Sequence, residues 1–216
     1  MNTSLANSTY YGILDTGYVA PESWTAKYQA LVSGGASIVQ IRAKGSTEAE
    51  RYQLTEQIVA HRSNSSAPQP HLIINDDIDL ALRYPGLGLH VGQDDLSPEA
   101  ARDRLGPDRL LGLSTHSPEQ ATAAMNLPDG VLNYFAVGPI FATQTKPTYV
   151  PVGLELIKFV AAQKPSLPFF CIGGINRSNI PQVIAAGASR FVTVSDALCA
   201  PDTAAAVRES IQLAKA

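Results

Sequence analysis

Two cations and an amide alternate with apolar residues in the stretch "QIRAK", residues 40–44. Gln40, Arg42 and Lys44 alternate there with Ile41 and Ala43, so a strand would place the three polar side chains on one face. That combination suits a polyanion such as a diphosphate. A solvated strand end with salt bridges is the alternative, but three polar side chains in a buried site are costly without a ligand. We therefore predict a diphosphate-binding face.

Acidic residues follow the next two apolar runs, in "NDD" (75–77) and "QDD" (93–95). On neighbouring strand ends, the carboxylates of Asp76 and Asp95 would converge, and Mg²⁺ favours one or two carboxylates completed by substrate phosphate and water. Helix N-caps are the alternative, with Asp77 capping residues 78–84 and Asp94 or Asp95 preceding residues 97–105. Because the cations of residues 40–44 would lie nearby and bind phosphate, we expect one Asp of each pair to bind the metal.

Hydroxyls, an imidazole and glycines follow the later runs. In "STHS", Ser114 continues a strand, and His116 is either a general acid/base or a turn residue. Glycines at 173–174 and the turn after residue 195 predict a site where backbone N–H groups meet a monophosphate. The stretch "GPIFATQTKP" (138–147) displays further polar groups on a loop, and we expect this loop to be a lid over the site. The candidate ligand-binding residues on this loop are Thr143, Thr145 and Lys146.

The elements that must position these residues are short, continuous apolar runs. Such runs, rich in Val, Ile, Leu and aromatic residues, are typical of parallel strands covered on both faces. They span residues 10–14, 37–41, 71–75, 88–91, 110–114, 134–137, 169–173 and 191–195.

Helical segments separate these runs. One begins with a capping box near Ser46, and two begin Ser-Pro-Glu, with proline at the first helical position. They span residues 21–35, 46–62, 78–84, 97–105, 117–125, 153–163, 179–188 and 202–216. Strict alternation of eight strands and eight helices over 216 residues predicts a compact (β/α)8 TIM barrel, a single α/β domain spanning residues 1–216. A doubly wound open sheet is the alternative.

Composition narrows the class of protein. Hydrophobic residues make up 45% of the chain and the net charge is −3, so no global basic field indicates nucleic acid. No apolar run reaches the roughly 20 residues that span a bilayer, and the first residues lack the pattern of a secretory signal. Cys171 and Cys199 form no disulfide framework or metal-ligand spacing, although a nucleophilic Cys171 is an alternative. We expect a cytoplasmic protein; a homo-oligomer is compatible with the sequence, which does not specify the oligomeric state.

In the order and at the spacing of its motifs, the chain resembles the thiamine phosphate synthase family. The matching stretches run from residue 39 to about 197 and are "VQIRAK", "IINDD", "LHVGQDDL", "GLSTHS", "VGPIFATQTK", "VGLELI", "IGGI" and "VS" before "DAL". The resemblance implies an Mg²⁺-dependent transferase that joins hydroxymethylpyrimidine diphosphate to a thiazole phosphate, releasing diphosphate.

The resemblance also implies roles for individual residues. Asp76 and Asp95 would bind Mg²⁺, and catalysis would depend on Arg42, Lys44, Ser114 and Lys146. The pyrimidine diphosphate would contact Gln40, Arg42, Lys44, Asn75, Ser114 and Lys146. The thiazole phosphate would contact Thr143, Thr145, Gly174, Val194 and Ser195.

Three positions depart from the family pattern: Ala43 replaces an expected acid, Pro147 an expected lysine, and Asp196 a small residue. An acid beside a phosphate site is repulsive unless it points away.

Two rival functions stay open. One is a thiazole tautomerase, a sister group that uses the histidine of "S-x-H-S" as a proton carrier. The other is a non-catalytic barrel that binds thiamine precursors, since fold alone does not decide function.

Overall fold

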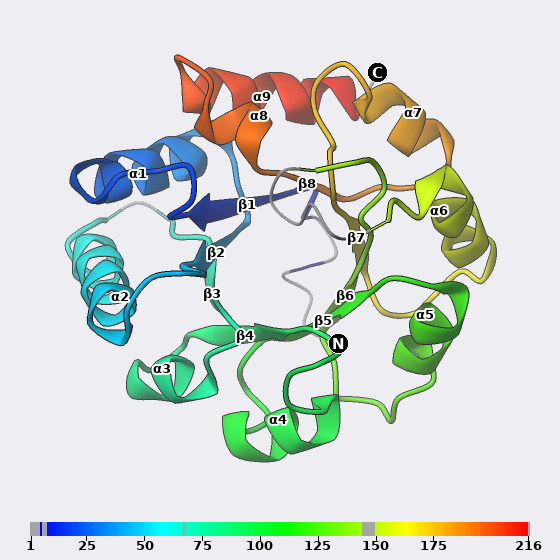
Figure 1. Ribbon diagram of the computed structural model, residues 1–216, viewed down its shortest axis with the longest axis horizontal. Helices are drawn as coiled ribbons and strands as arrows, with labels where there is room; N and C mark the ends of the chain where they lie inside the picture. Colours follow the sequence, from blue (N-terminus) through cyan, green and yellow to red (C-terminus); the bar gives the residue numbers. More distant parts are fainter. Residues whose placement is uncertain (1–4, 6–7, 67, 144–149, 216) are drawn as a thin grey trace.

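The computed structural model describes residues 5, 8–66, 68–143 and 150–215, and these form a closed barrel of eight parallel strands in sequence order (Figure 1). The predicted TIM barrel is confirmed, and the doubly wound sheet is wrong because β8 pairs with β1 and closes the barrel. The strands are β1 (Tyr10–Asp15), β2 (Ile38–Arg42), β3 (His71–Asn75), β4 (Gly88–Val91), β5 (Leu111–Thr115), β6 (Tyr134–Val137), β7 (Phe169–Cys171) and β8 (Phe191–Thr193).

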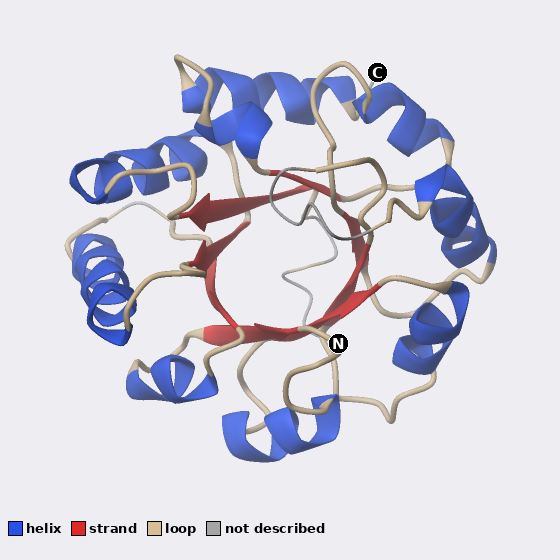
Figure 2. Cartoon of the chain, viewed as in Figure 1, coloured by secondary structure: helices blue, strands red, loops and turns tan. Residues whose placement is uncertain are grey.

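Helices surround the barrel as an outer ring (Figure 2). They are α1 (Trp24–Gly34), α2 (Glu48–Ser63), α3 (Ile78–Arg83), α4 (Pro98–Leu105), α5 (Pro118–Met125), α6 (Gly153–Ala162), α7 (Ile180–Ala185), α8 (Ser195–Leu198) and α9 (Thr203–Leu213). Two short elements were not expected: the 3₁₀ helix η1 (Pro21–Ser23) and α8, which begins directly after β8. No helix in the described part of the chain is long and apolar enough to span a membrane.

Local side-chain chemistry explains where several helices begin. The capping box of α2 is formed by Thr47 and Glu50 rather than by Ser46, because Thr47 has a Glu three positions further along the chain. Asp77 caps α3 by accepting a hydrogen bond from the Leu80 N–H at 3.0 Å. Ser97 caps α4, so neither Asp94 nor Asp95 is needed there. The cap alternative is thus correct for Asp77.

Two neighbouring strands, β7 and β8, end earlier than predicted. β7 stops at Cys171 because Gly173 and Gly174 adopt positive φ angles of 101° and 63°, outside the strand region. β8 stops at Thr193 because Val194 turns the chain into α8. The shorter strands leave backbone at the rim of the barrel, where loops can contact a ligand.

Alternation along the strands creates two hydrophobic clusters. Tyr10 and Leu14 of β1 point outward and pack in the large cluster between strands and helices, whereas Tyr11 and Ile13 point into the barrel. Leu5 is 2% exposed and joins the inner cluster. Cys171 is fully buried in the outer cluster, and burial raises the pKa of its thiol, which rules against a nucleophilic role.

The interior of the barrel has no room for a methyl group at Gly112 of β5. A Cβ there would lie 2.1 Å from the Tyr134 ring. We expect Gly112→Ala to lower the free energy of unfolding by about 1–3 kcal/mol, because overpacking forces the ring or backbone to shift. Urea unfolding measures this change.

Gly12→Ala is the matched control on β1, because its Cβ would meet the flexible tip of Leu31 at 3.2 Å and the Ala36 Cβ at an ordinary contact distance of 3.6 Å. Equal losses in the two variants would contradict the expected crowding around Tyr134.

Candidate active site

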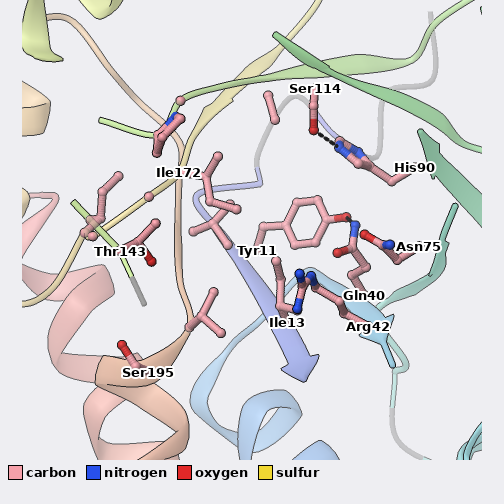
Figure 3. Close-up of a pocket in the computed structure, with 18 of the residues that line it drawn as sticks. Tyr11, Ile13, Gln40, Arg42, Asn75, His90, Ser114, Thr143, Ile172 and Ser195 are labelled. Atoms are coloured by element: carbon pink, nitrogen blue, oxygen red, sulfur yellow. Dashed lines mark hydrogen bonds between the residues drawn. The ribbon is translucent and has the colours of Figure 1, made fainter. Parts of the chain in front are cut away.

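A pocket of about 860 Å³, including its open mouth, lies at the carboxyl ends of the strands (Figure 3). Several of its walls are apolar, among them Ile13, Ala136, Ile172, Ile175 and Val192. The predicted site residues that line it are Gln40, Arg42, Asn75, Ser114, Thr143, Gly174, Val194 and Ser195. Figure 3 separates them into two groups, with Gln40, Arg42, Asn75 and Ser114 on one side and Thr143 and Ser195 on the other.

The predicted diphosphate-binding face is divided in the structure. Gln40 and Arg42 line the pocket, and Ile41 and Ala43 are buried in the outer cluster, as strand alternation requires. The Lys44 ammonium instead contacts the Asp76 carboxylate at 2.9 Å and its side chain is 55% exposed. Lys44 therefore sits at the rim, where it balances an acid rather than lining the cavity.

Arg42 is held by Asp15, a residue that was not predicted for the site. Its Nη1 atom donates to the Asp15 carboxylate at 2.6 Å, and Asp15 is almost fully buried. The β1–β2 register pairs Asp15 with Arg42, so the two side chains leave adjacent strand ends together. A guanidinium has five N–H donors, so this ion pair fixes Arg42 and still leaves donors for a phosphate.

The acidic pair is formed by Asp76 and Asp95. Asp76 has a left-handed backbone with φ of 62°, and its N–H donates to the His90 carbonyl at 2.8 Å. Asp95 accepts a hydrogen bond from the Gly92 N–H at 2.7 Å. Burial raises the pKa of Asp95, and the neighbouring Asp76 carboxylate raises it further against the opposing effects of Gly92 and Lys44. The two carboxylates therefore lie close enough to repel one another.

The chemistry of this pair fits Mg²⁺. Both donors are hard carboxylate oxygens, and two crowded carboxylates gain from a shared cation. No group of three or more His, Cys, Asp or Glu side chains suited to a metal occurs among the described residues. Asp76 and Asp95 would supply two acidic ligands. That is the number with which Mg²⁺ commonly binds proteins beside substrate phosphate.

Ser114, near the end of β5, and His116, directly after that strand, have different surroundings. The Ser114 hydroxyl lies 2.9 Å from His90 Nε2. The His116 Nδ1 atom lies 2.5 Å from the Gly138 carbonyl oxygen and must donate to it, since a carbonyl only accepts. His116 also lines the pocket, so it is placed to contact a ligand as well as to shape the turn.

Loops from β6, β7 and β8 form the second side of the pocket. Backbone bonds join the first two loops, because the Ile140 and Phe141 N–H groups donate to the carbonyls of Ile172 and Gly173 at 2.9 Å. Both loops lead to the predicted monophosphate contacts Thr143 and Gly174. Of the other contacts predicted for the loop after β6, Thr145 and Lys146 lie outside the described residues, as does Pro147.

Asp196 does not leave an unpaired charge at the phosphate side. Its carboxylate accepts a hydrogen bond from Arg177 Nε at 3.0 Å, so the acid is neutralised within α8 and the loop after β7.

Four inward-facing residues were missed by the sequence analysis: Tyr11, His90, Tyr134 and Asp15. Tyr11 and His90 line the pocket, and both lie within apolar runs that were interpreted only as strands. The available signal was period-2 alternation, which places Tyr11, Ile13 and Asp15 on one face of β1. That signal does not say which face is inward.

The buried ion pair makes a testable contribution to stability. We expect Asp15→Asn to lower the free energy of unfolding by about 1.5–3 kcal/mol, because it removes the charge that balances the nearly buried Arg42. Urea unfolding of both forms measures the difference.

Glu155→Gln is the control, because the Glu155–Lys158 pair is exposed and such pairs contribute about 0–1 kcal/mol. If the two substitutions cost the same, Asp15 does not hold Arg42 as described.

Comparison with known proteins places this geometry in a family. The family model described as thiamine monophosphate synthase matches residues 10–197. Thiamine-phosphate synthase of Pelotomaculum thermopropionicum is 38% identical over 95% of this chain and 92% of its own length. The enzyme of the same name from Chloroflexus aurantiacus is 38% identical over 92% and 89%.

A solved structure shares the fold. Thiamine phosphate pyrophosphorylase from Pyrococcus furiosus aligns with a TM-score of 0.74 at 23% identity, covering 96% of this chain and 95% of that one. On the match over residues 10–197 and the identity to its relatives, this chain belongs to the thiamine monophosphate synthase family.

Proposed function

We propose that this chain is a transferase that joins hydroxymethylpyrimidine diphosphate to thiazole phosphate, forming thiamine phosphate and releasing diphosphate. Family membership supports the reaction. The observation that links this reaction to the pocket is that the pocket has two different sides. One side has an amide, a guanidinium and a hydroxyl, and the other has loop glycines and hydroxyls. Two phosphorylated substrates need two such ends.

The side with Gln40, Arg42 and Asn75 suits the pyrimidine diphosphate. Arg42 is pre-positioned by Asp15, so little ordering entropy is lost when the guanidinium contacts a phosphate. Lys44 lies next to Asp76 at the rim and adds a second cation. The opposite side, with Thr143, Gly174, Val194 and Ser195, suits the thiazole phosphate.

Asp76 and Asp95 would hold Mg²⁺ at the rim. Bound there, the ion would neutralise charge on the diphosphate as it departs. Lys44 would then exchange its contact with Asp76 for the diphosphate, because both are available at the same rim.

The proposed chemistry is a dissociative substitution. The C–O bond breaks with its electron pair leaving on the diphosphate oxygen, and a pyrimidinylmethyl cation forms. The thiazole nitrogen then donates its lone pair to that carbon and becomes positively charged, so no proton is lost. Arg42 stabilises the departing anion. The apolar walls formed by Ile13, Ala136 and Ile172 exclude the water that would otherwise capture the cation.

Metal removal tests the proposed ion. We expect turnover to fall to background in excess chelator and to return on addition of Mg²⁺, because the diphosphate would lack its main neutralising charge. Product formation from both substrates is the measurement. Undiminished turnover in metal-free protein would overturn the metal proposal, and turnover of any kind would exclude a non-catalytic barrel.

The second candidate function is the tautomerase, because His116 lines the pocket and could carry a proton there. A pair of variants separates it from the synthase. We expect Asp76→Asn to lower thiamine phosphate formation by at least about 10²-fold, comparable to losing one strong electrostatic stabiliser. Asn suits this position because it tolerates the left-handed backbone of Asp76. His116→Ala should cost less than about tenfold, because the proposed reaction moves no proton.

Both reactions are assayed with both variants. An essential His116 and a dispensable Asp76 would replace the synthase by an isomerase that transfers a proton, for which a histidine contributes about 10²–10⁴-fold.

A further inference from the structure

A continuous chain of hydrogen bonds crosses the barrel interior from Gln40 to Ser114, and we name it the Gln40–Ser114 relay. Gln40 Nε2 donates to the Tyr11 hydroxyl at 2.9 Å, and the Tyr11 and Tyr134 hydroxyls lie 3.0 Å apart. The Tyr134 hydroxyl lies 3.1 Å from His90 Nδ1, and His90 Nε2 lies 2.9 Å from the Ser114 hydroxyl. Figure 3 shows Tyr11, Gln40, His90 and Ser114 around one side of the pocket.

Tight packing holds the middle of the relay. Tyr11, Tyr134 and His90 are all buried. The Tyr134 ring stacks on His90 at a centroid distance of 5.6 Å and meets Tyr11 edge-on at 5.8 Å. Burial raises the pKa of both phenols, so each hydroxyl keeps its hydrogen. The two phenols in the middle of the relay therefore stay neutral and are held in place.

Counting hydrogens gives the relay a direction. Since Gln40 donates to Tyr11, the Tyr11 hydroxyl donates to Tyr134, Tyr134 donates to His90 Nδ1, and His90 Nε2–H donates to Ser114. Each hydrogen that lies between two members of the relay then has an acceptor. Reversing only the middle of the relay would leave the Tyr11 hydrogen without an acceptor among the described residues, which is costly in a buried place. A full reversal requires the Gln40 amide, both hydroxyls and the His90 tautomer to change together.

This direction determines what the two ends offer a ligand. Gln40 is left with its carbonyl oxygen, an acceptor, and with the second hydrogen of its amide, and Ser114 is left with its hydroxyl hydrogen, a donor. Both residues line the pocket. The edge of a 4-aminopyrimidine offers the complementary pair, an amino donor beside a ring-nitrogen acceptor. A 4-oxopyrimidine offers the opposite pair, a ring N–H donor beside a carbonyl acceptor.

We propose that Tyr11, Tyr134 and His90 are positioning residues that make the site select the amino edge of the pyrimidine, by orienting the Gln40 carbonyl oxygen as acceptor and by fixing Ser114 as donor. The inference rests on the proposed function, because it assigns the pyrimidine to this side of the pocket. It adds three residues that need not touch the reacting atoms and act through Gln40 and Ser114.

Binding to Tyr134→Phe tests the inference, because this change removes the central hydroxyl and keeps the packed ring. Calorimetry with Mg²⁺ and no thiazole phosphate, so that no product forms, gives Kd for hydroxymethylpyrimidine diphosphate and for its 4-oxo analogue. We expect the wild type to prefer the amino form by about tenfold or more, the factor for one mismatched buried hydrogen bond. In Tyr134→Phe the preference should fall to less than about threefold, with KM for thiazole phosphate unchanged.

Tyr10→Phe is the matched control. Its hydroxyl bonds Thr193 at 2.6 Å in the outer cluster, so the variant loses one buried tyrosine bond without touching the relay. It should keep the wild-type preference. Tyr11→Phe replaces the test variant if Tyr134→Phe does not fold, and thermal unfolding of each variant checks this.

The outcomes separate the two proposals. If the wild type turns over but Tyr134→Phe keeps its preference, or Tyr10→Phe loses it equally, the relay does not set specificity and the synthase proposal stands. If the wild type binds neither pyrimidine and makes no product, the proposed function fails and the inference fails with it.

Discussion

Closure of the barrel is the constraint on which the rest of this structure depends. Eight parallel strands with β8 paired to β1 bring every inward side chain into one shared interior. An inward polar group there has no water and must find a partner from another strand. The pairing of β1 with β2 supplies such partners, because Asp15 lies opposite Arg42 and the Tyr11 hydroxyl accepts a hydrogen bond from Gln40. The hydrogen-bonded relay from Gln40 to Ser114 is the same requirement met by five strands at once.

Charge at the pocket mouth is balanced by local ion pairs. Arg42 is paired with Asp15, Lys44 with Asp76, and Arg177 with Asp196. These pairs differ in depth: Asp15 is almost fully buried, whereas the Lys44 side chain is 55% exposed. A deep pair positions a side chain permanently, since breaking it would leave a buried charge. A rim pair is screened by water and exchanges readily for another anion. The arrangement suits a site that keeps one cation still and lets another follow a diphosphate.

The sequence predicted the regular parts of this fold well. Continuous apolar runs separated by capped helices identified the strands, and their strict alternation identified the TIM barrel. The errors lie where local signals conflict. The α2 cap shifted from Ser46 to Thr47 because only Thr47 has a Glu three residues on. β7 ended early because two glycines took positive φ angles that only the fold requires. The helix α8 went unnoticed because four residues carry too little periodicity to predict.

By itself, the sequence determined which chemical groups stand at the strand ends: the amide and cations of "QIRAK", the acids after β3 and β4, and Ser114 after β5. It determined them because alternation and strand ends are local properties of the chain. Only the tertiary structure decided which of those groups share a cavity. Gln40 and Arg42 enter the pocket while Lys44 turns to Asp76, and Asp77 caps a helix while Asp76 faces Asp95. Tyr11, Tyr134 and His90 come from three separate strands, and their hydroxyls and ring nitrogens meet only because barrel closure brings the inward faces of those strands together.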